Sequence, residues 1–299
     1  TRTGGKDMII DMHYHLDERM EKMDRLIAQM DRHNIDRIAL VPPMVDPFHV
    51  EGTAEKLARF ARNLQTGKWN FLGRKLYESV VTKNGQFNIL GKKYDIDQQP
   101  DNNLVAAALK AHPERFYGWF FINPALEDAV AAMEKGLDSQ GWIGIKCHPY
   151  WHRYPVKQLD DAAAFCVARN LPLLLHLGGN KENGDFRHLP ERHPKLKLVY
   201  AHAGVPFYKK LWAYIRDKKN VYIDLSSPYL DEPLRRAAVA AVGPEKCFYG
   251  TDGPFGYPSP EDHIYDHGAI LTEINRLPVS AEDKEKIKGK NFIEMAGLS

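Results

Sequence analysis

Cysteine is scarce in this 299-residue chain, which has only Cys147, Cys166 and Cys247. Three cysteines far apart in the sequence do not make the paired framework of a disulfide-stabilised protein. They also lack the close pairing of a zinc site built from cysteines. We therefore expect reduced thiols in a cytoplasmic protein.

Long apolar runs and long basic runs are also missing. No apolar run reaches the about 20 residues that cross a membrane, and the polar start Thr-Arg-Thr-Gly-Gly-Lys-Asp predicts no signal peptide. The net charge is only +2. Nucleic acid and membrane are therefore not expected partners. With 43% hydrophobic and 27% charged residues, the composition is that of a soluble globular protein.

What the chain does have is a regular alternation of apolar runs and amphipathic stretches. The runs lack polar alternation, which indicates strands buried on both faces of a parallel sheet. The expected strands are Met8–His13, Arg37–Val41, Phe116–Ile122, Trp142–Lys146, Leu173–Leu177, Leu196–Ala201, Val221–Leu225 and Cys247–Gly250. The expected helices include Glu18–Arg32, Asn102–Ala111, Ala125–Ser139, Gln158–Arg169, Phe207–Lys218 and Ala281–Ala296.

Eight such strands predict an α/β fold, a (β/α)8 TIM barrel that forms a single domain over residues 7–299. The rival is a doubly wound open sheet, but no glycine-rich phosphate motif follows the first strand. Residues 42–100 break the alternation and combine aromatic with basic side chains. A segment of this length is either functional or carries its own structure. It is a lid or small cap over the active-site end, or else a packing or dimerisation insert.

Four histidines and one aspartate stand at the ends of predicted strands: His13, His15, His176, His202 and Asp252. The C-terminal ends of barrel strands meet on one face, so we expect these side chains to surround a single metal ion. His13 and His15 lie two residues apart on one strand and therefore point the same way. The alternative of hydrogen-bonded core histidines is weaker, because histidine is uncommon deep in a core.

These motifs resemble the amidohydrolase superfamily, and more narrowly its amidohydrolase 2 branch, which includes aminocarboxymuconate-semialdehyde decarboxylase. The resemblance runs from Met8 to about Gly297 and rests on His-x-His, on the strand-end histidines, and on the segments Gly144–Pro149 and Gly250–Phe255. It implies one divalent metal ion, Zn²⁺ before Mn²⁺, held by His13, His15, His176 and Asp252. It further implies that His202 stands beside the metal's water and that Asp252 shuttles protons.

Four more residues are candidates for substrate binding: Lys146, His148, Trp151 and Arg153. Lys146 has three interpretations, namely a carbamate bridging two metals, an anion-binding lysine or a structural ion pair; the resemblance to the mononuclear branch favours the second. Trp151 and Arg153 follow the fourth strand, where they would stack a flat ligand and clamp its carboxylate, unless this is an ordinary surface loop.

Further residues are expected in supporting positions. Asp224 and Ser226 end the seventh predicted strand, from which they would orient a ligand histidine. Asp11 precedes the histidine pair on the same side of its strand and is expected to lie deeper as a supporting partner.

The leading hypothesis is a metal-dependent hydrolase in which an activated water attacks an amide, lactone or similar bond of a small molecule. The alternative is a metal-dependent, non-oxidative decarboxylase of an aromatic or unsaturated carboxylic acid. The intact His13-x-His15 pair favours hydrolysis, because many decarboxylases of the branch carry Glu at the first position. A non-catalytic binding barrel would have no need for all five residues. We expect a small, planar, anionic substrate, and the resemblance makes a homodimer plausible.

Overall fold

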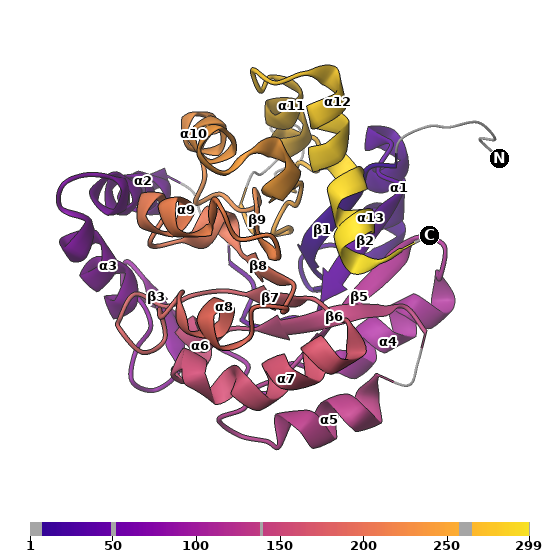
Figure 1. The fold of residues 1–299 in the computed structure, drawn as a ribbon, viewed down its shortest axis with the longest axis horizontal. Helices are drawn as coiled ribbons and strands as arrows, with labels where there is room; N and C mark the ends of the chain where they lie inside the picture. Colours follow the sequence, from indigo (N-terminus) through magenta and orange to yellow (C-terminus); the bar gives the residue numbers. More distant parts are fainter. Residues whose placement is uncertain (1–7, 49–51, 138–139, 257–264, 299) are drawn as a thin grey trace.

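The computed structural model describes residues 8–48, 52–137, 140–256 and 265–298. In these parts of the chain, eight strands form one parallel sheet in the order β1-β2-β5-β6-β7-β8-β9-β10. The strands are β1 (Ile10–His15), β2 (Arg37–Val41), β5 (Phe116–Phe121), β6 (Trp142–Cys147), β7 (Leu173–Leu175), β8 (Leu198–Tyr200), β9 (Val221–Asp224) and β10 (Cys247–Phe248). The predicted TIM barrel is confirmed, and Figure 1 shows the strands in the middle with helices around them.

Hydrogen bonds between β1 and the residues after β10 close the barrel. The backbone N–H of Met12 donates to the carbonyl of Tyr249 at 3.1 Å, and the N–H of Asp252 donates to the carbonyl of His13 at 2.7 Å. The carboxylate of Asp11 strengthens this seam by accepting the Thr251 N–H at 3.0 Å and the Thr251 hydroxyl at 2.5 Å. Asp11 therefore joins the two barrel edges, and this contact also places Asp252 beside the histidines of β1.

The helices lie close to where the sequence predicted them. They are α1 (Met23–His33), α4 (Asn102–Ala111), α5 (Ala129–Gly136), α6 (Pro149–His152), α7 (Asp160–Arg169), α8 (His188–Arg192), α9 (Lys209–Ile215), α10 (Glu232–Val242), α11 (Ala269–Asn275), α12 (Ala281–Glu285) and α13 (Asn291–Ala296). Short 3₁₀ turns are η1 (Val156–Leu159), η2 (His202–Gly204) and η3 (Pro244–Lys246).

Two helix predictions need correction. The first helix begins at Met23 rather than Glu18. The predicted closing helix over 281–296 is divided into α12 and α13 by a π-helical segment, η4 (Lys286–Lys290). Within η4, Gly289 packs against β1 so closely that a Cβ atom would lie 2.1 Å from the carbonyl oxygen of Met8. The break thus occurs where the last helix meets the bottom of the barrel. The end of the predicted helix 125–139 at Ser139 lies outside the described residues.

Local sequence signals explain many of the helix ends. The carboxylates of Asp101, Asp128 and Asp231 accept backbone N–H groups in the first turns of α4, α5 and α10. Asn34 and Asn170 end α1 and α7 in the left-handed conformation, each with φ of 56°, which asparagine tolerates better than most residues.

Residues 42–100 form a unit of their own on one side of the barrel. It consists of α2 (Gly52–Thr66), α3 (Asn70–Ser79) and an antiparallel hairpin of β3 (Gln86–Ile89) and β4 (Lys92–Asp95). Helices α2 and α3 pack closely at Gly73, where a Cβ atom would lie 2.6 Å from the backbone nitrogen of Gln65. The two helices lie at the left in Figure 1. We call residues 42–100 the inserted segment.

The inserted segment shares the hydrophobic core of the barrel. Its buried side chains Phe48, Tyr77, Val81, Phe87 and Ile96 belong to the same continuous apolar cluster as the barrel strands. Burial of apolar surface is the main favourable contribution to folding, so this contact fixes the inserted segment on the barrel. None of the helices in the described parts of the chain has the length and hydropathy of a bilayer-crossing helix.

Candidate metal centre

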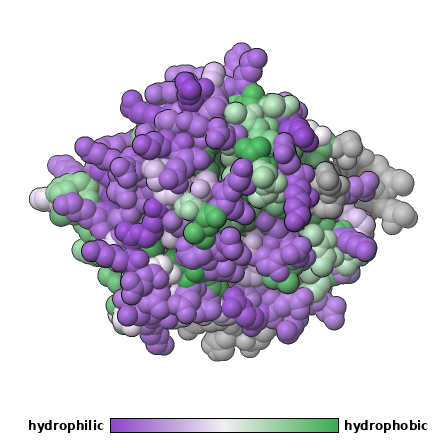
Figure 2. Space-filling model, turned by 90° about the horizontal axis from the view of Figure 1, so that it is seen from below, coloured by the Kyte–Doolittle hydropathy of each residue, from purple (hydrophilic) through white to green (hydrophobic). Residues whose placement is uncertain are grey.

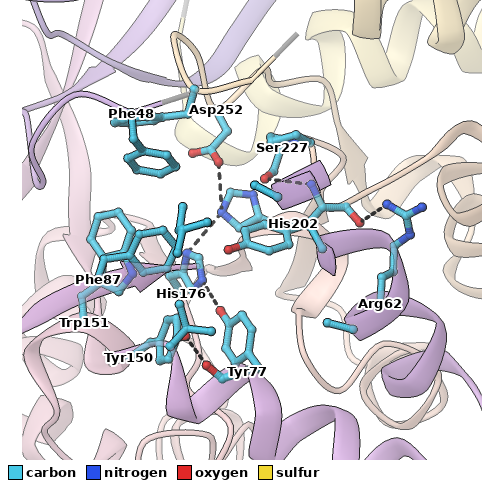
Figure 3. Close-up of a pocket in the computed structure, with 18 of the residues that line it drawn as sticks. Phe48, Arg62, Tyr77, Phe87, Tyr150, Trp151, His176, His202, Ser227 and Asp252 are labelled. Carbon is cyan, nitrogen blue, oxygen red and sulfur yellow. Dashed lines mark hydrogen bonds and ion pairs between the residues drawn. The ribbon is translucent and has the colours of Figure 1, made fainter. Parts of the chain in front are cut away.

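The structure brings together the five side chains at the C-terminal ends of the barrel strands. Figure 3 shows three of them, His176, His202 and Asp252. The carboxylate of Asp252 lies in their midst. Its oxygens are 3.6 Å from Nε2 of His13, 3.3 Å from Nε2 of His15 and 3.6 Å from Nε2 of His202. Nδ1 of His176 lies 3.1 Å from Nε2 of His202. Four segments far apart in the sequence thus contribute to one cluster.

Three members of the cluster have the spacing that a single ion requires. One ligand atom from each of His13, His202 and Asp252 lies within 4.8 Å of the other two. Ligands at about 2.0–2.2 Å from one zinc ion lie at comparable separations. This trio includes His202, which the sequence placed beside the water. The other two histidines adjoin this trio, since His15 contacts Asp252 and His176 contacts His202.

The second ring nitrogen of three histidines is held by a neighbouring group. Nδ1 of His13 lies 3.0 Å from a carboxylate oxygen of Asp224, and Nδ1 of His202 lies 2.8 Å from the hydroxyl of Ser226. Nδ1 of His15 lies 3.4 Å from the carbonyl of Pro42. The predicted contacts of Asp224 and Ser226 with site histidines are confirmed. Such partners fix the ring orientation and direct the Nε2 atoms toward the centre.

Burial keeps the rings of His13, His148, His176 and His202 neutral. Burial, together with the nearby Lys146 ammonium, lowers the pKa of His13 to about 3. It also lowers the pKa of His148 and His176 well below the usual value, and lowers that of His202. A neutral imidazole has the free lone pair that metal binding needs.

The carboxylates of the site are ionised. Burial by itself would raise the pKa of Asp252, but His202, His15 and His13 lower it below its usual range. The pKa of Asp224 is also lowered despite its burial, because His13 and Ser226 hydrogen-bond to the carboxylate. Lys146 is the buried cation beside them, with Nζ 3.2 Å from Nε2 of His13. Two buried carboxylates facing one lysine leave an excess negative charge, which a divalent cation would neutralise.

Two residues of the cluster have strained backbones. His202 and Asp252 have φ angles of 52° and 59°, in the left-handed region that residues with a Cβ atom rarely occupy. Such strain persists only where the surroundings impose it, and it is often found at functional sites.

Of the four residues predicted to bind substrate, two line the cavity in front of the cluster and two do not. His148 and Trp151 line the cavity in front of the cluster, and their rings stack with centroids 4.4 Å apart. Lys146 is fully buried behind His13 and does not line that cavity. The guanidinium of Arg153 donates to the carbonyls of Val81 at 2.9 Å and Thr82 at 3.2 Å, so it anchors the inserted segment.

Tyr77 is a site residue that the sequence reasoning did not assign. Its hydroxyl, from α3 of the inserted segment, lies 2.7 Å from Nε2 of His176. Its ring stacks on Tyr150 with centroids 4.1 Å apart, and the hydroxyl of Tyr150 donates to the carbonyl of Tyr77. The sequence signal was slight, because Tyr77 is one of several aromatic residues in that segment.

The cavity in front of the cluster is mainly apolar. Half of the residues that line it lie within positions 54–89 of the inserted segment: Ala54, Leu57, Ala58, Ala61, Arg62, Gln65, Leu76, Tyr77, Val80, Phe87, Asn88 and Ile89. Phe48, Trp151, Tyr229 and Phe255 add further aromatic surface. Figure 3 shows Phe48, Phe87 and Trp151 on one side of His176 and His202.

A family model described as Amidohydrolase matches residues 87–295. The chain belongs to the amidohydrolase family. The match is to the amidohydrolase 2 branch that the sequence motifs indicated, and it includes His176, His202 and Asp252. The histidine pair of β1 precedes the matched region and is joined to it only in the folded structure. No curated protein sequence matches the chain.

Solved structures with the same fold include both hydrolases and decarboxylases. A probable 2-pyrone-4,6-dicarboxylic acid hydrolase from Acinetobacter baumannii is 14% identical with a TM-score of 0.61, over 97% of this chain and 99% of that chain. A 2,6-dihydroxybenzoate decarboxylase from Rhizobium is 13% identical with a TM-score of 0.59, over 98% and 99%. A 5-carboxyvanillate decarboxylase from Novosphingobium aromaticivorans, solved with manganese and a nitrobenzoic acid, is 16% identical with a TM-score of 0.60, over 99% and 98%.

These similarities show a shared fold. The chemistry that this amidohydrolase can perform depends on its own residues. The cluster offers neutral imidazoles, ionised carboxylates and an excess of buried negative charge. This donor set fits a divalent ion such as zinc or manganese.

Proposed function

We propose that this amidohydrolase is a metal-dependent hydrolase that cleaves an amide, lactone or similar bond of a small molecule. The observation that carries the proposal is the convergence of three histidine Nε2 atoms on the carboxylate of Asp252, at 3.3 to 3.6 Å. We assign His13, His15, His176 and Asp252 as the ligands of one zinc or manganese ion. When bound, such an ion lowers the pKa of a coordinated water toward about 7 and polarises the substrate carbonyl.

The protein's own groups would handle the proton. Asp252 is ionised and touches three imidazoles, so its carboxylate can accept a proton from the attacking water and deliver it to the leaving group. His202 is held through Nδ1 by Ser226, with Nε2 directed at Asp252. We therefore give His202 the role of orienting the water and the scissile bond.

The second candidate is non-oxidative decarboxylation of an aromatic or unsaturated acid. It is supported by the aromatic walls of the cavity, where Phe48, Phe87 and Trp151 could stack a flat ring. In that reaction the substrate would be anionic, with its carboxylate at the metal. In both candidate reactions, residues 42–100 would act as a cap that excludes water from the reacting group.

Metal content and product analysis would test the proposal. Elemental mass spectrometry of protein purified without added metal should find about one zinc or manganese ion per chain. Hydrolysis of lactones or amides in ¹⁸O-labelled water should place the label in the product acid, whereas a decarboxylase would release CO₂ from aromatic acids. Two ions per chain would instead indicate a carbamylated Lys146. No metal after reconstitution would overturn the proposal.

A further inference from the structure

The inserted segment gives the cavity an apolar wall. The side chains that α2 and α3 present to it include Leu57, Ala61 and Leu76, and Val80 follows directly after α3. On the barrel side, Phe255 and Trp151 face them. A ligand that enters therefore exchanges water for hydrocarbon over most of its surface, which is favourable only for apolar groups.

Cations in the cavity wall are already engaged. Arg62 is the single lysine or arginine among the described lining residues. Its guanidinium donates to the carboxylate of Asp231 at 2.6 Å and to the carbonyl of Tyr229 at 3.2 Å. Figure 3 shows this guanidinium in contact with a backbone carbonyl. Since Lys146 and Arg153 lie elsewhere, an anionic group on the body of a ligand would find no free cation among the described lining residues.

Two buried polar atoms of the wall lack a partner. Nε1 of Trp151 and Oε1 of Gln65 have no hydrogen-bond partner among the described residues, although both side chains are more than nine-tenths buried. An unpaired buried donor or acceptor is unfavourable. A carboxylate buried on the body of a ligand would find no free cation in the described part of this wall to offset its loss of water.

We propose that the cavity takes a substrate with an apolar, uncharged body, such as an aryl or alkyl ester, lactone, amide or monocarboxylic acid, whose polar reacting group alone faces the metal centre. The proposal rests on the proposed function for one point, namely that the reacting group lies at the metal centre. It holds for hydrolysis and for decarboxylation alike. It excludes polycarboxylates as substrates.

Paired ligands would test the charge discrimination through binding affinity. Isothermal titration would compare 2-naphthoate with 2,6-naphthalenedicarboxylate, which carries a second carboxylate at the far end of the body. Whichever carboxylate of the diacid faces the metal centre, the other would be buried without a partner, so 2-naphthoate should bind at least about 30-fold more tightly. Equal or tighter binding of the dicarboxylate, or no binding of 2-naphthoate, would overturn the proposal. Failure of the hydrolase assignment would instead appear in the metal content and the products.

Variants of α2 would locate the discrimination in the inserted segment. Ala61→Asp places a carboxylate in the cavity wall and should weaken the binding of 2-naphthoate about 10-fold or more. The matched control is Phe60→Asp on the same helix, since Phe60 is 55% exposed and does not line the cavity. Its affinity should stay within about twofold of the wild type. Figure 2 shows apolar surface at the left edge, the side on which α2 and α3 lie in Figure 1.

Ala61→Arg keeps the test decisive if Ala61→Asp fails to fold. A guanidinium in the wall should reverse the preference, so that 2,6-naphthalenedicarboxylate binds more tightly than 2-naphthoate. An unchanged preference in a folded Ala61→Arg variant would show that α2 does not form the ligand-binding wall.

Discussion

The hydroxyl of Tyr77 lies 2.7 Å from Nε2 of His176, and this contact connects the inserted segment directly to the metal centre. The neighbouring Glu78 supports it, because its carboxylate accepts the N–H of Gly179 at 2.7 Å and the amide of Asn183 at 2.8 Å. Helix α3 is thereby docked on the loop that follows His176. Orientation of this histidine thus depends on a segment that is inserted between β2 and β5.

Tyr77→Phe should therefore weaken the metal centre without unfolding the protein. The ring and its stacking on Tyr150 remain, while the hydrogen bond to His176 is lost. Removing such a supporting contact typically costs about 10- to 100-fold in metal affinity or activity. Competition with a chelator would measure the affinity. Tyr94→Phe in β4 serves as the control, and an equal affinity of both variants would contradict the role of the contact.

His176→Ala should abolish metal binding and activity together, because we assign this imidazole as a ligand. Elemental analysis of the purified variant would give the metal content per chain, and circular dichroism would show that the barrel is intact. Full metal occupancy in the folded variant would remove His176 from the ligand set.

His202→Ala should have the opposite pattern, with the metal retained and turnover reduced by about 100-fold or more. The imidazole would no longer orient the reacting groups, while the assigned ligands remain. Metal content and initial rates on the same preparation would distinguish the two effects. Complete loss of metal would make His202 a ligand, as its spacing from His13 and Asp252 permits.

Asp224→Asn should lower metal affinity by about 10- to 100-fold. The carboxylate now accepts a hydrogen bond from His13 at 3.0 Å, and its charge makes that ring a better ligand. The neutral amide keeps the size but loses the charge. Asp217→Asn on the exposed surface is the control, and matching affinities of the two variants would argue that Asp224 is only structural.

The stability of the metal-free protein should rise with pH through the titration of Lys146. Burial lowers the pKa of this lysine from 10.5 to about 8. Between these values the folded protein binds fewer protons than the unfolded chain, so its free energy of unfolding increases with pH. The destabilisation is fully present below about pH 8 and is relieved toward pH 10.5 by up to roughly 3 kcal/mol.

Urea unfolding of the wild type and Lys146→Met from pH 7 to pH 10, after treatment with chelator, would measure this effect. The Lys146→Met variant should lack this increase in the free energy of unfolding. The stability of the wild type should therefore approach that of the variant as the pH rises. Parallel pH profiles for the two proteins would show that Lys146 does not lose its proton in this range.

The sequence predicted the barrel because its information is local. Each strand is a short apolar run, and β2 coincides with the predicted range Arg37–Val41. The helix α4 likewise matches Asn102–Ala111. The break at η4 was missed, because it occurs where Gly289 meets the backbone of Met8, a contact between the two ends of the chain.

The sequence by itself determined which residues stand at the strand ends, and hence the cluster of His13, His15, His176, His202 and Asp252. Parallel strands in a barrel present their C-terminal ends on one face, so position along each strand was sufficient. Only the tertiary structure decided that Tyr77 reaches His176, that Arg153 turns away from the cavity, and that the cavity wall is apolar. These features depend on how residues 42–100 pack on the barrel. Such packing joins side chains about a hundred positions apart, and no local pattern encodes it.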